Sequence, residues 1–194
     1  MRYGSERRET THSDLVETAA AMVRRDGPDK LSISELMKSA GLTHGGFYYH
    51  FASREDMVAR AIERAFVDTQ ARLEAICAAQ PAKAALRTYL EQYLSPGHRD
   101  ERSTGCPIPI LTSYAPLLGA ESRQAFEHGA ARLTSRLAAL MSEAGVTDAG
   151  TMAMSIFSEM SGALGISRVI ADRARSDEVL RLSLGAVLLR AMPA

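Results

Sequence analysis

The distribution of proline constrains the fold of this chain more than any other feature. Seven prolines leave two long stretches, 29–80 and 117–192, without one. Because proline costs ~3 kcal/mol inside a helix, long helices are permitted in these stretches. Both are rich in Ala, Leu, Glu, Arg and Met, which favour helices, and short β-branched runs with strict alternation are missing. We therefore predict an all-α fold.

Start and stop signals divide the first 80 residues into four helices. The first is expected from Ser13 or Asp14 to Arg25, and the second from a capping box at Ser32 and Glu35 to Gly41. The others are a very short helix from Thr43 to Tyr49 and a long one from Ser53 to Ala79, capped by Ser53 with Asp56 three residues on. The long helix, about 27 residues, spans about 40 Å, enough to join two structural units.

The rest of the chain predicts a larger helical body. We expect helices over 82–94, 110–118, 121–144, 148–170 and 176–192, with a bend rich in proline and glycine over 95–109. The chain then divides into residues 1–58, a three-helix unit, and residues 59–194, the helical body, with the long helix connecting them.

Composition narrows the class of protein. The chain has 194 residues, with two cysteines, Cys77 and Cys106, too few for a disulfide-stapled fold. Its start has no apolar core, and no apolar run approaches the ~20 residues of a membrane span. We expect a cytoplasmic protein without membrane contact. The five histidines and two cysteines show no metal-ligand spacing, so no metal or cofactor is expected. The 23 basic and 23 acidic residues cancel, which taken alone disfavours nucleic-acid binding.

Residues 33–51 nevertheless have the pattern of a helix-turn-helix. A helix, a glycine turn at Gly41 and a second short helix follow one another, and apolar side chains at suitable spacing lock them together. The core positions of this motif are Leu36, Ala40, Leu42, Phe47 and Phe51. The second helix would then lie in the major groove of DNA, with its N-terminal residues facing base edges.

Residues 14–58 resemble the DNA-binding domain of the TetR (tetracycline repressor) family of bacterial transcriptional regulators. The resemblance rests on an ordered string of short motifs. These are Ala19-Ala20, Gly27 before Pro28, Ala40-Gly41-Leu42-Thr43, Gly45, Phe47-Tyr48-Tyr49-His50-Phe51 and Ser53-Arg54-Glu55. The resemblance implies an all-helical C-terminal body that binds small molecules and dimerises through its last two long helices.

The same resemblance implies which residues contact DNA. They are Ser34, Thr43, His44, Gly45, Gly46, Tyr48, Tyr49, His50 and Arg54. Tyr48, His50 and Arg54 match positions that hold phosphates. His44 and Gly46 depart from the family pattern, which often has Lys and Ser or Thr there. Arg7 and Arg8 are either a solvated tail or an arm for the minor groove.

An effector pocket is expected in the body, apolar with a few polar groups. Its candidate residues, each with ordinary core packing as the alternative, are Tyr89, Tyr93, Cys106, Ile110, Tyr114, Phe126, Phe157 and Met160. Cys106 precedes an apolar helix, a position that lowers a thiol pKa and favours reaction with oxidants or electrophiles. Its alternative role is that of a small buried apolar residue.

The last two helices predict a homodimer. A stripe of small residues follows the first of them, at Thr151, Ser155, Ser158, Gly162 and Gly165, and the last helix is apolar on several faces. A helix that is apolar most of the way round is buried on more than one side. We expect helices 148–170 and 176–192 to form a four-helix bundle with their copies, the alternative being a tight monomer core. Glu159, the one charge between Ala149 and Ser167, faces either the pocket or the interface.

The leading hypothesis is therefore a homodimeric, ligand-responsive repressor that a small molecule releases from a palindromic DNA operator. One alternative makes oxidation or alkylation of Cys106 the signal. Another, an all-helical enzyme, has no acid–base, nucleophile–base or metal constellation to support it, so no catalytic residue is assigned.

Residues 1–66 hold ten basic and ten acidic side chains, yet no acid lies between Lys38 and Arg54. Few phosphate ion pairs and a shallow salt dependence of DNA binding follow.

Overall fold

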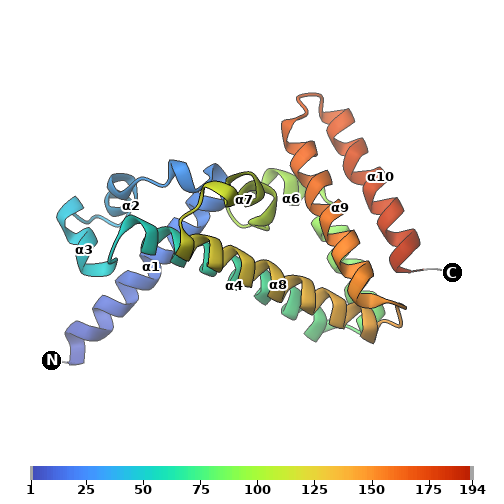
Figure 1. The fold of residues 1–194 in the computed structure, drawn as a ribbon, viewed down its shortest axis with the longest axis horizontal. Coiled ribbons are helices and arrows are strands. Elements are labelled where there is room, and N and C mark those ends of the chain that lie inside the picture. Colours follow the sequence, from blue (N-terminus) through green and yellow to red (C-terminus); the bar gives the residue numbers. More distant parts are fainter. Residues whose placement is uncertain (1, 193–194) are drawn as a thin grey trace.

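The computed structural model describes the backbone of residues 2–192 and the side chains of residues 7–192. Every regular element in this part of the chain is an α-helix or a 3₁₀-helix, which confirms the all-α class. Three N-terminal helices lie at one end of the elongated molecule, and a hairpin of two long helices lies at the other (Figure 1). The expected domain limits at residues 1 and 194 fall outside the described residues.

The N-terminal unit contains α1 (Arg2–Asp26), α2 (Ile33–Ser39) and α3 (Phe47–His50). Short 3₁₀-helices, η1 (Pro28–Lys30) and η2 (His44–Gly46), connect them. The predicted start of the first helix at Ser13 or Asp14 was wrong, because α1 runs through both residues. No proline lies before these residues, so the helix can begin earlier. The additional turns bring Arg8 into contact with the backbone carbonyl of Tyr49.

Two predicted helix caps are confirmed by hydrogen bonds. The Ser32 hydroxyl accepts from the backbone N–H of Glu35 at 3.4 Å, and the Ser53 hydroxyl accepts from the N–H of Asp56 at 3.0 Å. The Asp56 carboxylate in turn accepts from the N–H of Ala52 at 2.9 Å. These bonds satisfy donors that a helix N-terminus leaves free, so they fix where α2 and the long α4 begin.

The turn after α2 requires glycine. Gly41 has a φ of 69°, a left-handed conformation that side chains disfavour. Its N–H donates to the carbonyl of Lys38 at 3.0 Å, while the N–H of Leu42 donates to that of Met37 at 2.9 Å. This is the Schellman pattern of a helix end, and it turns the chain toward α3.

The body consists of seven α-helices and a further 3₁₀-helix, η3 (Ala115–Leu117), within residues 54–192. They are α4 (Arg54–Ala79), α5 (Ala82–Tyr93), α6 (Pro96–Asp100), α7 (Ile108–Tyr114), α8 (Ala120–Glu143), α9 (Ala149–Val169) and α10 (Arg173–Ala191). The predicted bend over 95–109 holds α6 and the start of α7. α10 begins before the predicted residue 176 because the Asp172 carboxylate caps it, accepting from the N–H groups of Ala174 and Arg175.

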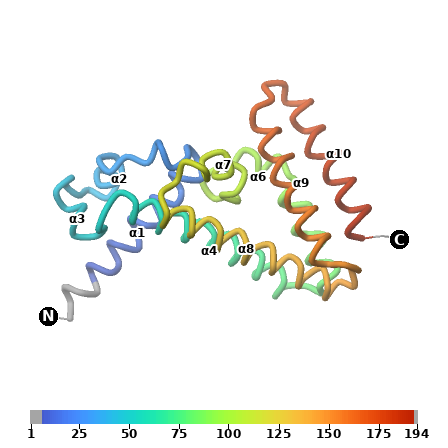
Figure 2. The backbone as a smooth tube through the Cα atoms, in the orientation of Figure 1, coloured from blue at the N-terminus to red at the C-terminus, as the bar shows by residue number. Residues whose placement is uncertain are grey.

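The α4–α8 pair forms the spine of the molecule. The two helices run side by side from the N-terminal unit to the α9–α10 hairpin (Figure 2). Gly129 of α8 lies directly against the ring of Phe66, and a Cβ atom at Gly129 would come within 2.2 Å of that ring. Phe126 packs edge-on against Phe66 at a centroid distance of 5.9 Å. Close approach of the helices therefore depends on a glycine.

Contacts also join the N-terminal unit to the body beyond the shared α4. The Tyr114 ring covers Gly27 at the end of α1, where an added Cβ would lie 2.8 Å from the ring. The Glu55 carboxylate accepts from the N–H of Ser122 at 2.9 Å, which caps the N-terminus of α8. The division at residue 58 stays a prediction, since these contacts cross it.

We predict that Gly129→Ala lowers the free energy of unfolding by ~1–3 kcal/mol, because the new methyl group overlaps the Phe66 ring and forces the helices apart. Urea denaturation measures the change. Gly150→Ala is the matched control, since a Cβ there meets open space. Equal stability of both variants would contradict the proposed close contact.

Candidate nucleic-acid interface and buried cavity

The short α3 separates buried from exposed aromatic rings. Phe47 and Phe51 are 0% and 1% exposed and belong to the core, as predicted. Tyr48 and Tyr49 are 70% and 59% exposed. The predicted DNA-contacting residues on α2, η2 and the loop between them are also on the surface. Ser34, Thr43, His44 and Gly45 are exposed, and Gly46 and His50 are half-buried. These residues gather at the free end of the N-terminal unit.

Arg8 of α1 holds Tyr49 in place. Its guanidinium lies 4.2 Å from the centroid of the Tyr49 ring, and Nη2 donates to the Tyr49 carbonyl at 3.1 Å. A cation over an aromatic face is favourable, and the hydrogen bond orients it further. Arg8 is therefore neither a solvated tail nor part of an extended arm, the two roles expected from sequence. The contact between Arg8 and Tyr49 forms because α1 begins earlier than the sequence predicted.

His50 is uncharged at neutral pH. Burial first, then the neighbouring His12 and Arg8, lower its pKa below the usual value. The two histidine rings stack at a centroid distance of 6.2 Å, and Nδ1 of His50 is buried without a hydrogen-bond partner among the described residues. In the protein without DNA, His50 therefore adds no positive charge to this surface.

Arg54 has a partner within the chain. Its Nη2 donates to the carbonyl of Pro28 at 2.8 Å and to that of Leu31 at 3.4 Å. The side chain thus ties the start of α4 to the loop before α2. Phosphate binding by Arg54 stays a prediction, and it would have to share the guanidinium with these two carbonyls.

A cavity of about 270 Å³ lies in the body between α4, α5, α6 and the loop after α6. Three predicted ligand residues, Tyr89, Tyr93 and Cys106, line it. Tyr89 and Tyr93 are 6% and 4% exposed, and neither hydroxyl has a hydrogen-bonding oxygen or nitrogen partner among the described residues. Burial raises the pKa of both phenols, so they are neutral. The weakly bonding Cys106 thiol neighbours the Tyr93 hydroxyl.

The other predicted ligand residues do not reach this cavity. Phe126 and Phe157 line a wider depression of about 720 Å³ between α7, α8 and α9. Met160 is fully buried in the core, Ile110 is half-buried against it, and Tyr114 covers Gly27. The structure thus divides the predicted set among two hollows and the core, because helical spacing alone does not reveal which apolar faces meet.

His98 is a cavity residue that the sequence did not reveal. Its Nδ1 donates to the Tyr93 carbonyl at 2.8 Å, and Nε2 accepts from the N–H of Cys106 at 2.9 Å. Both bonds require the neutral ring, and burial lowers its pKa to about 4. Gly105 permits this arrangement, since a Cβ there would lie 2.9 Å from Nε2. The one local sequence feature that points to this helix is Ser95, whose hydroxyl caps α6 by accepting from the N–H of His98.

The expected lowering of the Cys106 pKa was wrong. Cys106 is 3% exposed, and burial raises the pKa of its thiol. Burial outweighs the hydrogen bonds from Tyr93 and from the N–H of Ile108 at the start of α7, which lower the pKa. The oxidant-sensing alternative thus lacks the reactive thiolate on which it was based.

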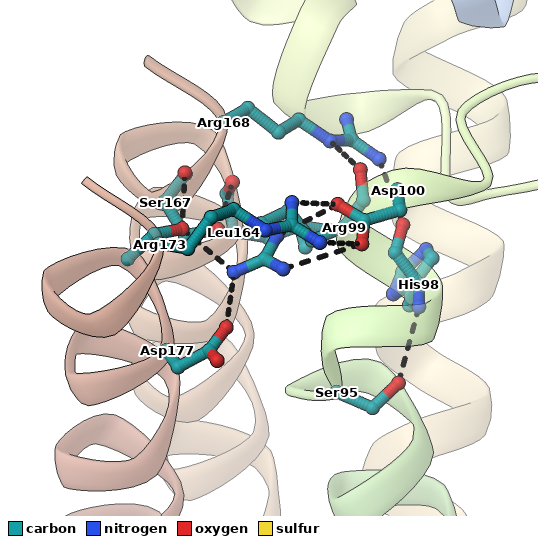
Figure 3. Close-up of polar contacts among 10 residues, drawn as sticks. Ser95, His98, Arg99, Asp100, Leu164, Ser167, Arg168, Arg173 and Asp177 are labelled. Carbon is teal, nitrogen blue, oxygen red and sulfur yellow. Dashed lines mark hydrogen bonds and ion pairs between the residues drawn. The ribbon is translucent and has the colours of Figure 1, made fainter. Parts of the chain in front are cut away.

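A polar network fixes α6 to the last two helices (Figure 3). Arg99, 3% exposed, donates to the hydroxyl of Ser176 at 2.7 Å and pairs with the carboxylates of Asp177 and Asp100. Asp100 also receives two hydrogen bonds from Arg173, at 2.9 and 2.7 Å. The network attaches the helix that carries His98 to the N-terminal part of α10.

The α9–α10 hairpin exposes a long apolar surface. Glu159 pairs with Arg190 of α10, so it bridges the two helices within one subunit. Added Cβ atoms at Gly162, Gly165 and Gly185 would meet open space. Large apolar side chains that are more than half exposed on these helices are Met154, Ile166, Val169, Leu182 and Leu189.

The N-terminal unit matches a known family. Residues 15–61 fit the model described as "Bacterial regulatory proteins, tetR family". The match covers the N-terminal unit and the start of α4, so these residues are similar to the DNA-binding domain of that family. The "Uncharacterized HTH-type transcriptional regulator YfiR" of Bacillus subtilis is 25% identical over 122 residues, 63% of this chain and 59% of that protein. The "HTH-type transcriptional repressor KstR2" of Mycobacterium tuberculosis is 38% identical over 55 residues, 28% of this chain and 27% of that protein. The chain thus aligns with less than two thirds of either relative.

Solved structures share the fold over nearly the whole chain. Reduced NemR of E. coli superposes with a TM-score of 0.79 at 22% identity, covering 93% of this chain and 96% of NemR. A TetR-family regulator from Cytophaga hutchinsonii gives a TM-score of 0.79 at 20% identity, covering 97% and 98%. At such identities the likeness shows the fold alone. The names of the relatives are those of regulators and give the enzyme alternative no support.

No helix within 2–192 has both the length and the apolar character needed to cross a bilayer. Among the side chains of 7–192, no three His, Cys, Asp or Glu groups come together as a metal site requires.

We predict that His98 makes stability depend on pH. Its folded pKa of about 4 lies below the ~6.5 of a free histidine, so unfolded chains bind the proton more tightly. The free energy of unfolding therefore falls between about pH 6.5 and pH 4, and by ~2 kcal/mol at pH 5 from this group. Urea denaturation at pH 7 and pH 5 measures the loss of unfolding free energy between the two pH values, and His98→Gln should reduce this loss. His128→Gln, at an exposed histidine, is the control and should show the same loss as the unchanged protein. A loss that His98→Gln leaves unchanged would contradict the assignment to His98.

Proposed function

We propose that this protein is a homodimeric transcriptional repressor of the bacterial cytoplasm, which a small molecule releases from a palindromic operator. The observation that carries the proposal is the exposed α2–α3 surface of a tetR-family domain, joined through α1 to a cavity in the body. Relatives named as regulators support the DNA-binding role, while ligand response and dimerisation rest on the geometry of this chain.

The DNA surface suits contacts other than ion pairs. Arg8 is engaged with Tyr49, Arg54 with two carbonyls, and Arg60 with Asp56 at 2.6 Å. Lys38 is exposed beside α3 without an ion-pair partner among the described residues. Recognition then falls to the hydroxyls, amides and imidazole of α3 and the residues before it. This arrangement explains how a chain of zero net charge binds DNA.

The dimer surface is the apolar face of the α9–α10 hairpin. A monomer that exposed five large apolar side chains on two adjacent helices would present an interaction patch. Open space above three glycines lets a second pair of helices approach closely. A four-helix bundle with two-fold symmetry buries both copies of this face and sets the distance between the two copies of α3.

Arg24 provides the link between the cavity and the DNA surface. This α1 side chain donates to the carbonyl of Ser103 at 3.2 Å, in the loop that forms one wall of the cavity. It also pairs with Asp68 of α4 at 2.6 Å. A ligand that displaces the loop would therefore shift α1 and α3. It acts as an inducer only if it binds the DNA-free arrangement more tightly.

We predict that Tyr48→Ala weakens operator binding about 10- to 100-fold, because it removes a hydrogen bond to a charged phosphate. A duplex selected from a random-sequence pool with the unchanged protein serves as the operator, and fluorescence anisotropy gives the affinity. Leu117→Ala, which removes another largely exposed side chain, on η3 of the body, is the control and leaves affinity unchanged. The slope of log affinity against log salt should be well below ten in magnitude. Failure to select any sequence would overturn the DNA-binding role.

We predict that Leu189→Asp converts a dimer of about 42 kDa, twice the 21.0 kDa chain, into a monomer in analytical ultracentrifugation. The carboxylate would be buried without a partner in the four-helix bundle. Leu117→Asp is a matched control, since Leu117 and Leu189 are 78% and 79% exposed but Leu117 lies on η3. A monomeric unchanged protein, or a dimeric Leu189→Asp variant, would contradict the proposed interface.

A further inference from the structure

The cavity between α4, α5 and α6 contains polar groups whose hydrogen-bonding capacity is unused. The hydroxyls of Tyr89 and Tyr93 are buried and have no oxygen or nitrogen partner among the described residues. Their rings lie 6.0 Å apart and line the same cavity, one helical turn apart on α5. Buried hydroxyls without partners are unfavourable, so a native site that keeps two of them indicates a bound group that accepts or donates there.

His98 does not supply that partner. Both of its ring nitrogens are engaged with backbone groups, Nδ1 with the Tyr93 carbonyl and Nε2 with the N–H of Cys106. It therefore forms a fixed, neutral part of the wall. The remaining hydrogen-bonding groups at the cavity are side chains of α4 and α5 and the loop after α6.

Arg72 supplies a positive charge at the cavity mouth. Its Nη2 donates to the Thr69 hydroxyl at 3.2 Å. The nearest carboxylate on α4, that of Asp68, is engaged by Arg24 and Arg64, each at 2.6 Å. Burial and the charge of Arg24 lower the pKa of Arg72, as expected for a cation without a full counter-ion. Arg72 and Tyr89 line the same cavity, from α4 and α5 respectively.

A second arginine lies next to the loop wall but outside the cavity lining, since a Cβ at Gly105 would be 3.3 Å from Nη2 of Arg168. Arg168 of α9 acts electrostatically on Tyr93 and Cys106, and its own bonds go to the carbonyls of His98 and Arg99. Glu101, the carboxylate that lines the cavity, is hydrogen-bonded to the Ser103 hydroxyl and is exposed. The cavity lining thus combines Arg72, the exposed Glu101 carboxylate, the hydroxyls of Tyr89 and Tyr93, and an apolar wall of Leu73 and Ile76.

We propose that the cavity binds a small organic carboxylate, with the carboxylate held by Arg72 and the Tyr89 and Tyr93 hydroxyls and an apolar ring against Leu73 and Ile76. Charge-assisted bonds to a carboxylate satisfy the guanidinium and both hydroxyls together. A volume of about 270 Å³ lies just below the usual range of ligand pockets, which limits the ligand to about one ring. That such an acid acts as the effector rests on the function proposed above.

Matched pairs of acids and amides test the charge requirement. Benzoate and benzamide, cyclohexanecarboxylate and cyclohexanecarboxamide, and 3-phenylpropionate and its amide are titrated into the full chain without DNA by calorimetry. We expect at least one acid to bind about tenfold or more tightly than its amide, and to raise Tm accordingly. Absence of binding by all three acids, or equal binding of acids and amides, would overturn the proposal.

Variants assign the preference to individual side chains. Arg72→Gln should abolish the acid preference, while Tyr89→Phe and Tyr93→Phe should each weaken the acid several-fold without unfolding the protein, as Tm of the free variants will show. Arg87→Gln is the control, because Arg87 lies on α5 outside the cavity, on an exposed surface beside Glu91. An Arg72→Gln variant that still prefers the acid would overturn the role of Arg72.

Release from DNA is measured separately, by anisotropy with the selected operator and the tightest acid. An acid that binds the free protein but leaves the operator complex intact would contradict the effector role while the carboxylate site remains. An acid that fails to bind, with operator binding intact, would instead contradict the site alone.

Discussion

The buried guanidinium of Arg24 is the interaction on which the arrangement of the two units depends. It is 4% exposed and donates to the carbonyls of Ala65 and Ser103 and to the carboxylate of Asp68. A buried cation must keep such partners, because leaving it without them is costly. The three acceptors lie on α4 and on the loop beside the cavity, whereas Arg24 lies on α1. The position of the DNA-reading unit is therefore tied to the wall of the cavity.

Other arginines also connect segments that are distant in the sequence. Arg54 ties α4 to the loop before α2, Arg99 ties α6 to α10, and Arg8 fixes Tyr49 of α3. The planar guanidinium, with five donors, suits such multiple contacts. These arginines are engaged by groups of the same chain, so in the proposed complex the DNA contacts fall to neutral groups.

The cavity holds two of the buried polar atoms that have no hydrogen-bonding oxygen or nitrogen partner among the described residues, the hydroxyls of Tyr89 and Tyr93. Other such atoms, including Nε of Arg24 and the Ser122 hydroxyl, lie outside it. His98 and Arg99 are neighbours on α6, and they face the cavity and the α9–α10 hairpin respectively. One short helix therefore connects the proposed ligand site with the proposed dimer surface. A change at either place has a direct structural route to the other.

The sequence by itself determined the helical class, most helix limits, the caps at Ser32 and Ser53 and the turn at Gly41, because these depend on local hydrogen bonds and backbone conformation. The resemblance to the tetR family over residues 14–58 agrees with the family match over 15–61. Only the tertiary structure decided the early start of α1, the raised pKa of Cys106 and the place of His98 in the cavity. Helical periodicity shows that a face is apolar but not which face it meets, and burial and charge pairing arise only where distant segments come together.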